Sequence, residues 1–154
     1  MRTRTIMLTV VLCLVAGAAW AASNPFMGTW KLNEAKSKIA AGTAKNMTVV
    51  YEAAGDQIKA TVDGLDADGK PMHNEWTGKF DGKDYAVTGD PSSDARAAKM
   101  IDDHTVELTV KKGGKVTATG KNVVSADGKT RTLNTTGTDA KGNKFKNVAV
   151  YDKQ

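Results

Sequence analysis

The feature that most constrains this chain is a two-residue alternation of apolar and polar side chains along most of its length. Successive side chains of a strand point to opposite faces, so apolar residues of one parity predict half-buried antiparallel strands. The first run is Phe26, Gly28, Trp30 and Leu32. Further runs are Met47, Val49 and Tyr51; Ile58, Ala60 and Val62; Met72, Trp76 and Phe80; Tyr85 and Val87; Val106, Leu108 and Val110; and Val116, Ala118 and Val124.

Short clusters rich in aspartate and glycine separate these runs, at 54–56, 66–70, 81–83, 113–115, 126–129 and 141–143. Glycine after aspartate supplies the positive φ that tight hairpin turns require. The pattern predicts about ten strands joined by short turns. They lie near 26–33, 45–53, 57–64, 71–80, 84–88, 94–101, 104–111, 115–125, 129–137 and 143–151.

This meander predicts an all-β fold, an antiparallel up-and-down barrel of about 8–10 strands. Closure removes the exposed sheet edges that favour aggregation, and a two-sheet sandwich is the alternative. One segment interrupts the alternation. Asn33 as a cap, helix-tolerant residues over 34–41 and a terminal Gly42 predict a short helix after the first strand, with Ile39 covering an open end of the barrel.

The N-terminus has the features of a secretory signal. Arg2 and Arg4 precede an uncharged, mostly apolar stretch, and Ala19-Trp20-Ala21 has the small-x-small pattern of a cleavage site. The stretch is short for a membrane span, although an uncleaved anchor is the alternative. We therefore expect a signal peptide at 1–21 and one domain at 22–154 without an integral membrane span. The protein would be exported, to a bacterial periplasm or to the outside.

Cysteine and charge narrow the function classes. The only cysteine, Cys13, lies in the signal stretch, so the mature chain would form no disulfide, which suits a bacterial envelope protein. Loss of the two signal arginines leaves 20 basic against 17 acidic residues, a formal charge of +3. The lysines are spread along the chain and form no run interleaved with aromatic residues, so nucleic acid is not an expected partner.

Two segments resemble a known family. Phe26-Met27-Gly28-Thr29-Trp30 resembles the Gly-x-Trp signature on the first strand of lipocalins and fatty-acid-binding proteins. The segment 147–153 resembles the last strand of the fatty-acid-binding group, and the whole mature chain looks like uncharacterised lipocalin-like proteins of bacterial envelopes. The resemblance implies a calycin-type barrel that holds a ligand inside.

The resemblance fails at the ligand carboxylate. Fatty-acid-binding proteins grip it with two arginines and a tyrosine, and those arginines fall at Val123 and Ala149 here, so only Tyr151 matches. A buried carboxylate would lack its counter-charges, so neutral apolar ligands are expected to bind better than fatty acids. Arg131 shares parity with Leu133 and has an inward alternative, but a strand-end arginine that reaches solvent is the favoured interpretation.

The candidate ligand-binding residues are aromatic. They are Trp30, Tyr51, Trp76, Phe80 and Tyr85 on one alternating face, together with Tyr151. Such sets are most often simply core. Small residues of the same parity favour an interior with room for a ligand, since ten strands enclose more space than eight. These small residues are Gly28, Ala60, Gly78, Ala118 and Gly120.

Metal and catalytic signals are weak. His73 and His104 are distant in sequence, and the aspartates of 64–69 are better explained by a hairpin loop than by a calcium loop. Ser92, Ser93 and His104 lack an activating motif. We expect no metal, no cofactor and no catalytic residues. The leading function is binding of a small, mostly apolar molecule, the alternative is a protein-facing envelope module that uses its loops, and an enzyme is third.

Overall fold

The computed structural model describes residues 24–154 as ten antiparallel strands and one three-residue 3-10 helix. The predicted all-β antiparallel barrel is confirmed, and the expected signal peptide at 1–21 lies outside the described residues. The elements are β1 (Gly28–Leu32), η1 (Glu34–Lys36), β2 (Lys45–Ala54), β3 (Gln57–Leu65), β4 (Pro71–Gly78), β5 (Asp81–Thr88), β6 (Ala95–Asp102), β7 (Thr105–Lys112), β8 (Lys115–Val124), β9 (Thr130–Thr138) and β10 (Lys144–Lys153).

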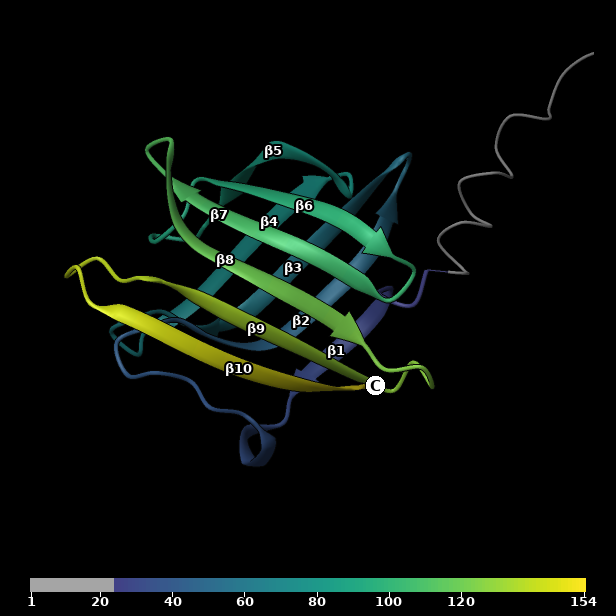
Figure 1. Ribbon diagram of the computed structural model, residues 1–154, viewed down its shortest axis with the longest axis horizontal. Coiled ribbons are helices and arrows are strands. Elements are labelled where there is room, and N and C mark those ends of the chain that lie inside the picture. The colour runs from purple at the N-terminus through teal and green to yellow at the C-terminus, as the bar shows by residue number, and fades with distance from the viewer. Residues whose placement is uncertain (1–23) are drawn as a thin grey trace, which may run out of the picture.

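Each strand pairs with its neighbours in sequence, and β1 pairs with β10 to close the barrel. In Figure 1, β7 to β10 form the front wall and β2 to β4 cross behind them. The short strand β1 lies between β2 and β10. Its Trp30 is opposite Val49 on β2 and opposite Lys153 on β10. Because the hydrogen-bonded strands form a closed ring, their inward-facing side chains form one continuous interior surface.

The loops alternate between two ends of the barrel. The closed end carries 24–27, 55–56, 79–80, 103–104 and 125–129, and the open end carries 33–44, 66–70, 89–94, 113–114 and 139–143. At the closed end, a turn in which Met27 N–H donates to the Asn24 carbonyl directs Phe26 into the core. Phe26 and Trp30 are fully buried, and the Trp30 indole N–H donates to the Phe26 carbonyl at 2.8 Å. These two rings seal the closed end.

The predicted helix over 34–41 is wrong in extent. Only Glu34–Lys36 forms a 3-10 turn, capped by the Asn33 side chain, which accepts from Lys36 N–H. The chain then pairs with β10, because Lys38 exchanges backbone hydrogen bonds with Val148 and Ala40 N–H donates to Asn147 Oδ1. Hydrogen bonds to β10 replace those that a helix would have made. Ile39 nevertheless lies at the open end, as expected.

Val116 does not point inward as the alternation predicts; it is 56% exposed. The pairing of β7 with β8 shifts by one residue, from Val110 opposite Ala118 to Lys111 opposite Val116. Thr117 is the extra residue of this bulge, and its hydroxyl donates to the Val110 carbonyl. A one-residue bulge shifts the alternation, so Val116, before the bulge, and Ala118, after it, do not share a face of the sheet.

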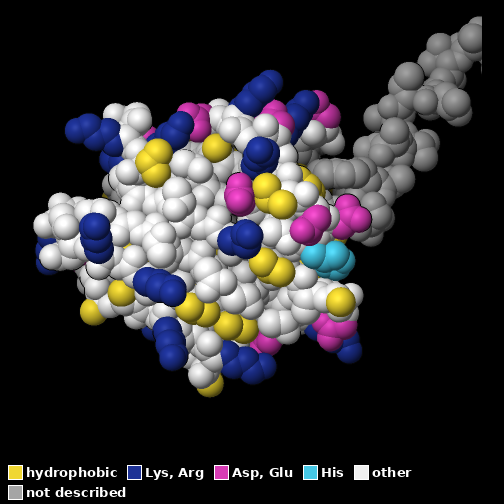
Figure 2. Space-filling model, viewed as in Figure 1, with side chains coloured by type: hydrophobic (Ala, Val, Ile, Leu, Met, Phe, Trp, Pro, Cys, Tyr) yellow, Lys and Arg dark blue, Asp and Glu magenta, His cyan; other side chains and the backbone are white. Residues whose placement is uncertain are grey.

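The outer surface carries mixed charge. Lysine side chains are scattered over the face shown in Figure 2, with acidic residues among them. Within residues 24–154, no helix is long and apolar enough to cross a membrane.

Candidate functional site

The barrel contains a cavity of about 630 Å³ that reaches from the open end to the middle of the interior. Its walls are mainly small and branched apolar side chains, which leave space because ten strands enclose more volume than side chains of this size fill. The mouth is formed by the loops around 39–44, 66–68, 90–92 and 138–141. The deep walls include Val49, Ala60, Val62, Ala98, Val106, Leu108, Asn122, Arg131, Leu133 and Ala149.

Four of the six predicted ligand-binding residues line this cavity: Tyr51, Trp76, Phe80 and Tyr151. Trp30 and Tyr85 are not part of the lining. Trp30 lies beneath it, at the closed end, and Tyr85 lies at the seam between β4 and β5, where only Glu75 and Trp76 pair with Thr88 and Val87. Parity placed five of them on one face, and the family resemblance added Tyr151, but neither resolved how deep along the barrel each residue lies.

Aromatic rings fill the seam between β4 and β5. The ring of Trp76 meets Tyr85 edge-on at 5.9 Å and stacks with Phe80 at 6.4 Å between centroids. The Trp76 indole N–H donates to the Arg96 carbonyl of β6 at 3.1 Å. Gly78 therefore does not leave room for a ligand, because a Cβ there would lie 2.6 Å from atoms of Trp76 and Tyr85. The side chains close the barrel wall where backbone pairing is missing.

Gly78→Ala should lower the free energy of unfolding by about 1–3 kcal/mol, the usual cost of overpacking a filled site. The added methyl group would clash with the rings of both Tyr85 and Trp76. Urea denaturation measures the loss. In a Tyr85→Ala background the same substitution should cost less, with the contact to Trp76 remaining, and an equal cost in both backgrounds would show that the Tyr85 ring does not occupy this space.

Arg131 corrects a sequence prediction. The favoured interpretation placed it in solvent, but its exposure is 1%. On β9 it follows the inward parity of Leu133, and it lies opposite Val124 on β8 and Tyr151 on β10, both buried. The alternation of side chains correctly indicated an inward Arg131, whereas the general tendency of arginine to reach solvent led to the wrong interpretation.

Aromatic rings surround the Arg131 guanidinium. Its central carbon lies 4.1 Å from the Tyr151 ring centroid, 5.4 Å from Tyr51 and 5.6 Å from Trp30. Its Nη1 donates to the Tyr51 hydroxyl at 3.2 Å. Its Nε and Nη2 are buried and make no hydrogen bond within the described residues. The ring faces attract the cation but leave two donor groups unsatisfied.

Other polar groups lie around the guanidinium. Burial raises the pKa of Tyr151, against the opposing effect of Arg131, so its phenol stays protonated at neutral pH. The Tyr51 hydroxyl accepts from Arg131 and retains its own proton to donate. Asn122, whose Oδ1 is buried and has no hydrogen-bond partner in the described part of the chain, adds an amide to the same lining. We call Arg131, Tyr51, Tyr151 and Asn122 the polar floor.

The second interior arginine, Arg96, has a partner. Its Nη2 lies 2.6 Å from Asp90 Oδ2, its Nη1 donates to Asn74 Oδ1 at 3.1 Å, and Ser93 Oγ donates to the same aspartate. Burial raises the pKa of Asp90, but hydrogen bonds from Ser92 and Ser93 and the charge of Arg96 outweigh it and hold that pKa below its ordinary value. This compensated pair fixes the 89–94 loop at the cavity mouth.

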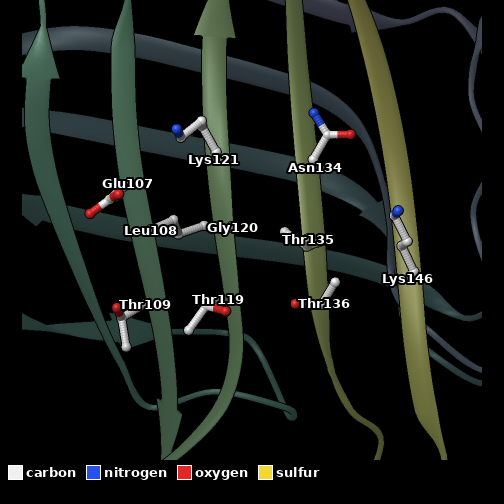
Figure 3. A pocket seen from close by; sticks show the side chains of 10 residues that line it. All are labelled: Glu107, Leu108, Thr109, Thr119, Gly120, Lys121, Asn134, Thr135, Thr136 and Lys146. Atoms are coloured by element: carbon white, nitrogen blue, oxygen red, sulfur yellow. The ribbon is translucent and has the colours of Figure 1, made fainter.

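A shallow hollow of about 350 Å³ lies on the outer face of β7 to β10. In Figure 3, Glu107, Lys121 and Lys146 flank a row of threonines on this face. The strand register places Thr109, Thr119 and Thr136 side by side, and Glu107 opposite Lys121. Polar and oppositely charged pairs of this kind are typical of a solvated sheet face.

The weak catalytic and metal candidates are not brought together. Ser92 and Ser93 lie at the open end, bonded to Asp90, whereas His104 lies at the closed end. His73 contacts Asp63 at 2.6 Å on the exposed surface. Among residues 24–154, no group of three or more His, Cys, Asp or Glu side chains is placed to hold a metal ion.

Comparison with known proteins shows no family. No protein-family model matches the chain, and no curated protein matches it. A solved structure of a redesigned β-barrel, mFAP1, bound to DFHBI, is similar at 16% sequence identity and a TM-score of 0.43, over 87% of this chain and 99% of that chain. At this identity and TM-score the likeness carries no argument about ligand or activity.

Proposed function

We propose that this protein binds a small, mostly apolar molecule inside the barrel. The observation that carries the proposal is the 630 Å³ cavity, which has the size of a small-molecule site and whose mouth is formed by the loops of the open end. Apolar side chains supply most of its lining, and the polar floor supplies the few directional groups that such sites use. Binding rather than catalysis is part of the proposal.

No feature of the described residues favours the alternative of a protein-facing module. The large hydrophobic side chains exposed within residues 24–154 are Ile101, at 47%, and Val116, at 56%. Ile101 is near the closed-end turn after β6, and Val116 is near the open-end turn before β8. They therefore form no common apolar patch of the kind that marks a protein interface.

Filling the cavity tests the proposal. Ala60 is buried on β3 and lines the cavity, whereas its neighbour Thr61 points to the other face. Ala60→Phe should weaken binding of 1-dodecanol, followed through tryptophan fluorescence, by about tenfold or more, because a ring would occupy ligand space. Thr61→Phe should bind as the wild type does. Equal affinities in all three proteins, or no saturable binding to the wild type, would contradict a ligand site in the barrel.

Export of the protein and its membership of the lipocalin-like barrels are part of the same proposal. The signal features of 1–21 support export to a periplasm or to the outside, and Gly28 and Trp30 on β1 support a place among lipocalin-like barrels. Intact-mass analysis of the protein from its own cells should show a chain that begins at Ala22 or close to it. A chain that retains Met1 would contradict the export proposal.

A further inference from the structure

We propose that the ligand carries a single oxyanion, such as a carboxylate or a sulfonate, and that Arg131 binds it at the polar floor. This inference rests on the proposed function and names the ligand class. It reverses the expectation that neutral ligands bind best, because that expectation considered only Val123 and Ala149 and placed Arg131 in solvent.

The first argument is charge. Arg131 is 1% exposed, and no carboxylate within residues 24–154 lies within ion-pair distance of it. An arginine keeps its proton in proteins, so the interior holds a positive charge without a counter-charge. Burial of an uncompensated charge is strongly unfavourable, and the aromatic faces around the guanidinium offset only part of that penalty. A negative ligand group would repay the rest.

The second argument is hydrogen bonding. Among the described residues, the Nε and Nη2 of Arg131 have no hydrogen-bond partner, and they belong to the fork of donors that matches two oxygens of one anion. Arg131, Tyr51 and Tyr151 all line the cavity, so the proposed anion would enter from the open end. Because Nε and Nη2 are buried, side chains around the guanidinium would have to shift to admit it. The hydroxyl groups of Tyr51 and Tyr151 are further donors in the same lining.

The third argument is the contrast with Arg96. That arginine lines the same cavity, but Asp90, Asn74 and Ser93 occupy its guanidinium. The chain thus neutralises the arginine at the mouth with its own aspartate and leaves the deeper one free. The apolar walls between the two levels fit a ligand with an apolar body and its charge at the inner end.

Matched ligand pairs test the inference. Calorimetric titration of the full chain with dodecanoate and 1-dodecanol, and with 2-naphthoate and 2-naphthol, compares ligands that differ in the anionic group. The wild type should bind each anion about thirtyfold or more tightly than its neutral partner, the range measured when a buried charge pair is broken. Arg131→Met should abolish this preference and retain the neutral ligands. Arg131→Lys should keep part of the preference, because it keeps the charge but not the fork.

Lys121→Met is the matched control, since it removes a cation from the outer face of β8, away from the cavity. It should leave the preference unchanged. Equal affinity of the wild type for anionic and neutral partners would overturn the inference and leave the proposed function standing. Binding of neither class would overturn both. If Arg131→Met does not fold, Tyr51→Phe decides the point: it should reduce the preference several-fold, and an unchanged preference would count against the polar floor.

Discussion

Trp30→Ala should lower the free energy of unfolding by about 3–5 kcal/mol, the cost of removing a large buried aromatic side chain. Trp30 is fully buried at the closed end, where its ring lies 5.1 Å from Lys153 Nζ and 5.6 Å from the Arg131 guanidinium. The substitution would also leave the Phe26 carbonyl without its hydrogen bond. Since domains of this size are stable by about 5–15 kcal/mol, the loss is a large share of the total.

The adjacent Thr29 supplies the control for this prediction. It lies on the same strand, half-buried, with its side chain on the outer face. Thr29→Ala should change the stability much less than Trp30→Ala, as judged by urea denaturation with unchanged m-values. Similar losses in the two variants would mean that the inward and outward faces of β1 are assigned the wrong way round.

Asp90→Ala should be comparably destabilising, by about 3–5 kcal/mol, because it leaves the Arg96 guanidinium buried without its counter-charge. The side chains of Asp90 and Arg96 are only 6% and 15% exposed, so solvent screens the pair little. The double variant Asp90→Ala/Arg96→Met should recover much of the loss, since both charges are then gone. Asp56→Ala, which breaks the exposed pair with Lys79, should have little effect.

The same pair predicts a pH dependence. The pKa of Asp90 is below its ordinary value in the folded protein, so the folded state favours the carboxylate more than the unfolded state does. Its contribution is therefore fully present above the ordinary carboxyl pKa of about 4 and is lost as pH falls through the lower folded value. The stability difference between the wild type and Asp90→Asn should shrink below about pH 4. A difference that is constant with pH would contradict this account.

The strands could be predicted from sequence because their signal is local. Alternation and Asp-Gly turns placed all ten of them, with bounds within a few residues. The failures came from long-range pairing. The 34–41 segment bonds to β10, which lies more than a hundred residues away in sequence. The bulge at Thr117 appears only when β7 and β8 are aligned, and it reverses Val116.

The sequence indicated which residue types line the cavity but not how deep along the barrel each of them lies. Tyr51, Trp76 and Phe80, expected from parity, and Tyr151, expected from the family resemblance, line the cavity. Trp30 shares that parity but fills the closed end, and Tyr85 shares it but fills the β4–β5 seam. The position of each residue along the barrel depends on how far its strand extends, which parity does not give. Arg131 shows the limit of residue-type tendencies, because its exposure is decided by its neighbours Val124 and Tyr151 on the flanking strands.

Native mass spectrometry of the folded protein purified from its own cells tests the central claim most directly. A ligand held in a cavity of this size would add a mass on the order of a few hundred daltons, at one molecule per chain. We expect that additional mass in the wild type, its loss on unfolding, and its absence from Ala60→Phe. A wild-type protein that carries no additional mass, and gains none after incubation with dodecanoate or 1-dodecanol, would contradict a ligand-binding barrel.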